Sequence, residues 1–387
     1  MSKRSLFVGP FVAAAILVFG CREPITAPET LATAPATTGR APSAGDAAAR
    51  PPLDLPSSLA SISQLFGVWD SCDPHGPPCL PKRPVCLEES LLSHYLGAEL
   101  GRVRNAGEES LWNELYAVYA ELIPTYEAIY FQTTATPQYF GYTGEFTKVI
   151  AKTERDVKRF WDIPSSEIQV LGIHGTMLLD QERTYRTYRL LNFPDGIAAS
   201  YAHRAADALG ASTAMHGGNY VYFTYGSASY REAGLPDKIV IGDGILEAYA
   251  AIGYGDVAPQ AILAHEYAHQ IQYENGYFHD LGAVAQNDII RYTELMADAM
   301  AGYYLTHKRG AALNAKRVVR FLETFHQIGD CAGTKNVLHG TQDQRVAAGE
   351  FGVRVAKEAR KQGHILSSAQ FHDLFLAYYP TLIASTP

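Results

Sequence analysis

The sequence predicts an α+β fold in which short strands precede a mainly helical C-terminal part. Two patterns indicate this class. The segments with strand character lie between residues 168 and 241, whereas the last third of the chain shows helical periodicity almost throughout. The chain is 47% apolar, and about 330 residues follow its low-complexity N-terminal part, which is enough for one large domain or two smaller ones.

Residues 1–20 have the order of a secretory signal peptide. Two cations, Lys3 and Arg4, precede an apolar run at residues 6–19, which is directly followed by Gly20 and then Cys21. This run is shorter than the roughly 20 residues that a membrane-spanning helix needs. We therefore expect a targeting segment that is removed, and not a transmembrane helix.

The sequence Val-Phe-Gly-Cys at residues 18–21 resembles the lipobox of bacterial lipoproteins, in which the Cys is lipidated and becomes the mature N terminus. This resemblance implies lipidation at Cys21 and an extracytoplasmic location in the cell envelope, on the periplasmic face in a Gram-negative source. An ordinary cleaved signal with a chance Cys is the alternative. Residues 21–56 are rich in Ala, Pro and Thr and lack aromatics, so we expect a disordered tether.

The segment that follows, residues 57–86, contains three of the four remaining cysteines. Cys72, Cys79, Cys86 and the distant Cys331 are an even number, so in an oxidising compartment they predict one or two disulfides whose pairing stays open. The alternative is a structural metal site that also uses His75. The gaps between these cysteines are longer than those of zinc knuckles, which favours disulfides.

The N-terminal region, residues 57–235, is predicted to be largely helical, with a few short strands. Apolar residues recur at helical spacing between residues 87 and 130. Strands are predicted at Ile168–Ile173, Tyr220–Thr224 and Lys238–Ile241, each bounded by Gly, Pro or Asp. The third strand either lies at the sheet edge, where it could pair with an extended peptide, or is an ordinary buried strand.

Residues 265–269 read His-Glu-Tyr-Ala-His and match the H-E-x-x-H motif of zinc hydrolases. The flanking residues predict a helix, because Asp256 can cap its start, Pro259 suits its first turn and Gly276 suits its end. Imidazoles four residues apart on a helix point the same way, so both can reach one Zn²⁺ at about 2.0–2.1 Å. The alternative is a surface helix whose polar residues bind nothing.

A catalytic zinc needs a third protein ligand, and the helix predicted at residues 289–307 offers one. The metzincin arrangement is excluded, because its third His would stand where this chain has Asn275. Glu294 and Asp298 lie one turn apart on the second helix. The small pair Ala301-Gly302 lies near their face, so we expect it to let the two helices approach closely.

This two-helix pattern resembles the gluzincins, in which a Glu on the following helix completes the zinc site. Within that group it is similar to the putative neutral zinc metallopeptidases of bacteria over about residues 236–362. The resemblance implies a zincin-like catalytic region at 236–387 with His265, His269 and Glu294 as ligands of Zn²⁺. It rests on the blocks at 263–272, 294–302, 329–330 and 339–345. The region before residue 236 has no counterpart in that family.

The charges of the motif residues suggest their roles. Glu266 would take a proton from zinc-bound water and hand it to the leaving group. Asp298 would accept the second N–H of a ligating His and so fix its tautomer. A negatively charged intermediate also needs a hydrogen-bond donor. The resemblance suggests His339 and Arg345 for this task, with Tyr292 and His326 as further candidates, and a structural role is open for each.

The expected function is hydrolysis of peptide bonds in a peptide or protein substrate by a membrane-anchored extracytoplasmic zinc peptidase. Two alternatives stay open, namely a catalytically silent zinc-binding lipoprotein scaffold and a zinc amidase that acts on cell-wall peptides. A net charge of −8 argues against nucleic acid as a partner.

Overall fold

The computed structural model describes residues 90–278, 284, 288–330, 339–362 and 364–385. The predicted signal peptide, tether and Cys-rich loop lie outside these residues, as do all five cysteines, including Cys21. Among the described residues, none of the helices combines the length and the apolar character that a membrane crossing requires.

The described chain is mainly helical and contains one three-stranded sheet, which confirms the α+β class. The strand order is β1-β3-β2, in which β1 (Gln169–Ile173) runs parallel and β2 (Ser227–Tyr230) antiparallel to β3 (Lys238–Gly242). The interpretation of β3 as an edge strand is therefore wrong, because β3 is the central strand and is buried along its whole length. β2 lies at the edge.

The predicted strand at Tyr220–Thr224 is also wrong. This segment contains the 3₁₀ helix η4 (Val221–Phe223). Its aromatic rings pack around Trp112, with centroid distances of 5.6 Å to Tyr222 and 6.1 Å to Phe223. Tertiary packing of these rings therefore outweighs their strand propensity, and the chain pairs with β3 only after Gly226.

The predicted helical stretch at residues 87–130 is described from residue 90 onward, and this part contains three helices, so the helix prediction is confirmed there. The helices and 3₁₀ helices before the last strand are α2 (Leu91–Asn105), α3 (Glu109–Ala117), α4 (Ile123–Phe131), α5 (Thr147–Phe160), η2 (Gly175–Leu179), α6 (Gln181–Leu190), α7 (Asp195–Ala211) and η3 (His216–Gly218).

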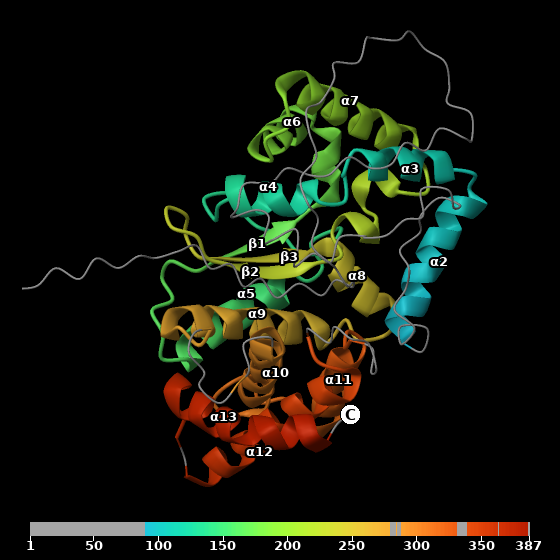
Figure 1. Ribbon diagram of the computed structural model, residues 1–387. Helices are drawn as coiled ribbons and strands as arrows, with labels where there is room; N and C mark the ends of the chain where they lie inside the picture. Colours follow the sequence, from blue (N-terminus) through green and yellow to red (C-terminus); the bar gives the residue numbers. More distant parts are fainter. Residues whose placement is uncertain (1–89, 279–283, 285–287, 331–338, 363, 386–387) are drawn as a thin grey trace, which may run out of the picture.

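The helices after β3 build the lower half of the molecule in Figure 1. They are α8 (Asp243–Ala251), α9 (Ala258–Asn275), α10 (Ile289–Thr306), α11 (Ala315–His326), α12 (Gln342–Gln362) and α13 (Ser368–Ser385). Helix α4 contacts the sheet from one side and α9 from the other. Helix α10 packs on α9, and α12 packs on α10, so α9 is the layer between the sheet and the C-terminal helices.

The predicted end of α9 is confirmed, but its predicted cap is not. Pro259 stands in the first turn, and Gly276 ends the helix with a φ of 70°, a conformation that glycine adopts without strain. Val257, and not Asp256, occupies the N-cap position. The Asp256 carboxylate instead forms an ion pair of 2.8 Å with Arg320 of α11, which explains why it does not cap the helix.

Glycines bring α10 and α12 into backbone contact. A Cβ atom on Gly302 would lie 2.4 Å from the carbonyl oxygen of Gly349, and one on Gly352 would lie 1.9 Å from that of Ala299. The expectation that Gly302 lets α10 approach α9 is therefore corrected, because its small size serves the contact with α12.

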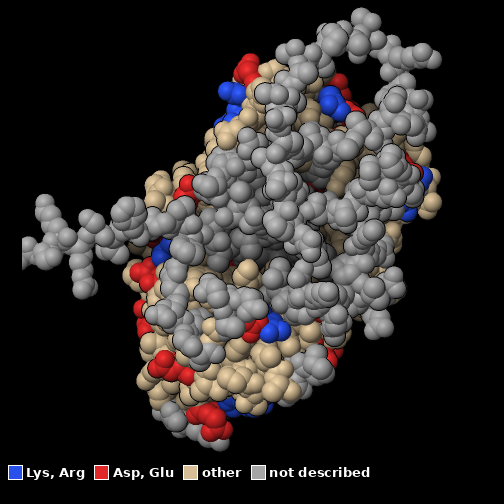
Figure 2. All heavy atoms as spheres, in the orientation of Figure 1, with Lys and Arg blue, Asp and Glu red and all other residues tan. Residues whose placement is uncertain are grey.

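Charged side chains of both signs are mixed on the face drawn in Figure 2. Among the described residues, several form surface ion pairs, such as Lys152 with Asp156 at 2.6 Å and Arg104 with Glu109 at 3.2 Å. Exposed pairs of this kind contribute at most about 1 kcal/mol each. Stability of the described part must therefore come mainly from its buried apolar core.

Candidate metal centre

The three predicted ligand residues meet between α9 and α10. The Nε2 atoms of His265 and His269 lie 3.2 Å apart. Glu294 places one carboxylate oxygen 3.4 Å from Nε2 of His265 and the other 3.7 Å from Nε2 of His269. The two histidines therefore each direct one ring nitrogen toward a common point, and Glu294 directs its carboxylate toward the same point.

The geometry of this group fits a bound metal ion. Atoms bonded to one tetrahedral zinc at about 2.0–2.1 Å lie about 3.3 Å from one another. The two imidazole nitrogens lie 3.2 Å apart, and each has a different oxygen of Glu294 within 3.7 Å. The three residues are buried, with at most 4% of any of them exposed. Two imidazoles and a carboxylate could hold zinc, although the same atoms also bind other divalent transition metals.

The electrostatics of the group favour a positive charge at the common point. Burial alone would lower the pKa of His265, but the charges of Asp298 and Glu294 outweigh it and raise this pKa to about 9. Burial lowers the pKa of His269 to about 4. Burial would raise the pKa of Glu294, but the neighbouring histidines hold it well below its usual range. A cation bound between these side chains would likewise compensate the negative charges of Glu294 and Asp298.

A buried ion pair supports His265 from behind. Its Nδ1 atom lies 2.8 Å from Oδ1 of Asp298, which is the contact expected from the sequence. Arg345 donates two hydrogen bonds to the same carboxylate, from Nε at 2.7 Å and from Nη2 at 2.8 Å. Arg345 is therefore placed as the partner of Asp298, which differs from its predicted role as a donor to a reaction intermediate.

His269 has a different support, which sequence reasoning missed. Its Nδ1 atom lies 2.8 Å from Oε1 of Gln272, and the amide nitrogen of Gln272 donates to the carbonyl oxygen of Thr293 at 2.8 Å. Gln272 stands three residues after His269 on the same helix, and this spacing was the only signal that could have identified it.

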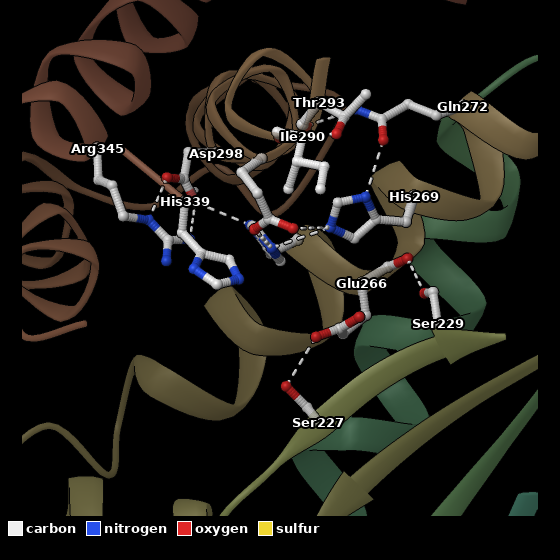
Figure 3. Close-up of polar contacts among 12 residues, drawn as sticks. Ser227, Ser229, Glu266, His269, Gln272, Ile290, Thr293, Asp298, His339 and Arg345 are labelled. Carbon is white, nitrogen blue, oxygen red and sulfur yellow. Dashed lines mark hydrogen bonds and ion pairs between the residues drawn. The ribbon is translucent and has the colours of Figure 1, made fainter. Parts of the chain in front are cut away.

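Strand β2 holds Glu266 from the other side (Figure 3). Ser227 donates to Oε1 of Glu266 at 2.7 Å, and Ser229 donates to its carbonyl oxygen. Oε2 of Glu266 has no hydrogen-bond partner among the described residues. Burial raises the pKa of this carboxyl group to about 8, although the positive charge of His265 and the bond from Ser227 oppose the shift. One carboxylate oxygen is thus fixed and the other is available.

A small cavity of about 10 Å³ opens beside Glu266 and His265. Its other walls are mainly apolar and come from α8, α9, α11 and the residues after α11. A space of this size is near the lower limit for one water molecule. The lining residues are Ser227, Tyr249, Ala261, Ile262, His265, Glu266, Thr324, Phe325 and Ile328.

The structure places His339 near the ligands and Tyr292 elsewhere. Asp330 accepts a hydrogen bond of 2.6 Å from the backbone N–H of His339 and lies 3.4 Å from its Nδ1. The charge of His339 contributes to the lowered pKa of Glu294, so this imidazole lies near that ligand. Tyr292 packs against rings of α13 instead, and His326 is the last residue of α11. Sequence reasoning assigned no role to Asp330.

Comparison of this chain with protein-family models, with curated proteins and with solved structures finds no match. The resemblance to gluzincins therefore rests on the motif residues alone. The function has to be argued from the chemistry of the buried site.

Proposed function

We propose that this protein is a zinc-dependent hydrolase of peptide bonds, with a gluzincin-type site on a zincin-like core, anchored outside the cytoplasm by lipid at Cys21. The observation that supports it is the meeting of His265, His269 and Glu294 at one buried point, with the carboxyl group of Glu266 beside it. Two imidazoles favour zinc over magnesium or calcium, which prefer oxygen ligands.

Zinc held by these residues would supply a Lewis acid that polarises the substrate carbonyl group and acidifies water. The positive charge of a metal ion held beside Glu266 would lower the pKa of its carboxyl group and keep it ionised. Glu266 would then accept the proton of the attacking water at Oε2 and deliver it to the leaving amine, because Ser227 occupies its other oxygen. His339, supported by Asp330, would donate a hydrogen bond to the oxygen on which negative charge develops.

The position of Glu266 argues against a catalytically silent zinc scaffold. A buried carboxyl group with an oxygen that has no partner among the described residues is costly, and a scaffold gains nothing from it. The site chemistry suits any amide, including a cell-wall peptide, because fold and metal do not select the substrate. The substrate class therefore has to be part of the test.

Replacement of Glu266 by Gln tests the proposal. Purified full-length protein should contain one zinc per chain in both forms, whereas hydrolysis should fall by about 10²–10⁴-fold in the variant, the usual contribution of a general base. Glu274→Gln is the matched control, since Glu274 lies on the same helix but pairs with Arg231 at its surface. Unchanged hydrolysis in Glu266→Gln would refute the mechanism.

Two substrates distinguish peptidase from amidase activity. Denatured protein and purified peptidoglycan are incubated separately with the wild-type enzyme and with Glu266→Gln. Glu266-dependent cleavage of denatured protein supports the peptidase. Cleavage of peptidoglycan alone replaces it with the cell-wall amidase, and zinc binding without cleavage of either substrate supports the scaffold.

A further inference from the structure

We propose that Gln272 is a positioning residue, which fixes the tautomer of His269 and ties its ring to the turn of α10 that carries the third ligand. The proposal rests on the proposed function, because it takes the group between α9 and α10 to be a zinc site. Gln272 is completely buried. It bridges Nδ1 of His269 and the carbonyl oxygen of Thr293, each at 2.8 Å.

The orientation of the Gln272 amide follows from the Thr293 contact. A backbone carbonyl can only accept a hydrogen bond, so the amide nitrogen of Gln272 must face it. The amide oxygen then faces His269, and this oxygen also can only accept. Nδ1 of His269 must therefore carry the hydrogen.

This orientation determines the state of Nε2, the other ring nitrogen of His269. With the hydrogen on Nδ1, Nε2 of His269 keeps its lone pair, and this atom lies 3.7 Å from Glu294 and 3.2 Å from Nε2 of His265. Asp298 imposes the same tautomer on His265. Once a metal ion displaces the proton from Nε2 of His265, both rings would direct a lone pair toward one point, which is the arrangement that a metal ion requires.

The two supports differ in charge and in what they connect. Asp298 is an anion neutralised by Arg345 of α12, whereas Gln272 is neutral and reaches Thr293, the residue directly before Glu294. A single side chain thus connects the ring of one ligand on α9 to the turn of α10 that carries another ligand.

Three variants of the purified full-length protein separate the role of the acceptor from that of the donor. Gln272→Leu and Gln272→Glu both lose the amide donor to Thr293, but only Gln272→Glu keeps an oxygen for His269. Gln270→Leu is the control for loss of a buried amide from α9, because Gln270 donates to the carbonyl oxygen of Lys238 at 2.9 Å, on the side of the sheet.

Zinc affinity is measured by competition with a chromophoric chelator. Loss of such a support typically weakens metal binding about 10–100-fold, so we expect this loss in Gln272→Leu. Gln272→Glu, which keeps the acceptor for His269 but loses the donor to Thr293, should lose less, and Gln270→Leu should stay within a few-fold of wild type. Equal affinities of Gln272→Leu and Gln270→Leu would overturn the role of Gln272 while leaving the proposed function intact. A wild-type protein that binds no zinc would overturn both.

A second measurement needs no variant and covers the case in which Gln272→Leu does not fold. In metal-free wild-type protein with ¹⁵N-labelled histidine, the ring nitrogens of His269 should show the hydrogen on Nδ1. A hydrogen on Nε2 would contradict the proposed orientation of the Gln272 amide.

Discussion

The carboxylate of Asp298 is completely buried and is shared between His265 and Arg345. Replacement of Arg345 by Leu would leave this negative charge without its main compensation. We expect the free energy of unfolding to fall by about 3–5 kcal/mol, which is the usual cost of removing one partner of a buried ion pair. Denaturation in urea measures the change.

The double variant Arg345→Leu with Asp298→Asn is the control for the charge. It removes both members of the pair, so it should recover part of the lost stability. If Arg345→Leu unfolds at the wild-type urea concentration, the ion pair does not support the site as described.

Ser227 and Ser229 permit a second comparison at the scale of single residues. Both face Glu266, but Ser227 donates to its carboxylate and Ser229 to its backbone carbonyl. Ser227→Ala should reduce hydrolysis at least about tenfold, because a hydrogen bond to a charged group contributes about 1.5–3 kcal/mol. Zinc content should not change. Ser229→Ala is the control and should affect hydrolysis less; the reverse order would contradict the assignment.

The motif residues could be predicted from their spacing within the helix that became α9 and within the helical stretch that follows it. His265 and His269 follow from local periodicity, and Glu294 follows from the next helical stretch together with the family resemblance. Ser227 could not be predicted in this way, because it lies 39 residues from Glu266 in the sequence and serine occurs in many environments. The contact of Arg345 with Asp298 spans 47 residues, so only the folded chain could show it.

At the scale of elements, the contact between α10 and α12 depends on glycine. Gly352→Ala would place a methyl group 1.9 Å from the carbonyl oxygen of Ala299. We expect a loss of about 1–3 kcal/mol or more, because tightly packed backbones cannot absorb the added atom without moving. Gly101→Ala in α2 is the control, since nothing lies within 4 Å of its Cβ position. Removal of a helical glycine there should stabilise the protein slightly, and thermal melting measures both.

A pair of carboxyl groups joins α8 to the residues before α5. Burial and the hydrogen bond to Glu145 raise the pKa of Glu247 to about 8, from an ordinary value of 4.5. The backbone N–H of Tyr142 also donates to Glu247, at 3.2 Å. The folded state therefore binds a proton more tightly than the unfolded state, so the resulting stability is present below pH 4.5 and is lost as the pH rises toward 8.

Glu247→Gln should remove this pH dependence, because the amide stays neutral and can still accept from Tyr142 and donate to Glu145. The melting temperature of the variant should exceed that of wild type more at about pH 8.5 than at about pH 5.5. Glu182→Gln changes an exposed glutamate and controls for net charge. A difference that is the same at both pH values would argue that the pair does not share a proton.

The strands show which elements a sequence pattern identifies. β1 and β3 were predicted within one residue of their observed bounds, because their runs of branched apolar residues fit a buried sheet. β2 reads Ser-Ala-Ser-Tyr and was missed. Its two serines face Glu266, so the composition of this strand reflects the site and not strand propensity.

On the scale of the whole molecule, the sheet crosses the boundary that the sequence suggested at residue 235. β1 and β2 come before this boundary and β3 after it, yet all three form one sheet. The resemblance to the zinc metallopeptidases starts at about residue 236, so it could not include β2, the strand whose serines contact Glu266. A fragment limited to residues 236–387 would lack both neighbours of β3, and we expect it not to reproduce the site.

A metal ion between α9 and α10 should also stabilise the whole fold. Each helix supplies ligands, and α10 in turn packs against α12, so loss of the ion should loosen the contact between the sheet layer and the C-terminal helices. Zinc at 1,000 times its dissociation constant would add about 4 kcal/mol to the free energy of unfolding. A chelator should therefore lower the melting temperature of wild type but not of Glu294→Ala, and an equal response of both proteins would place the metal elsewhere.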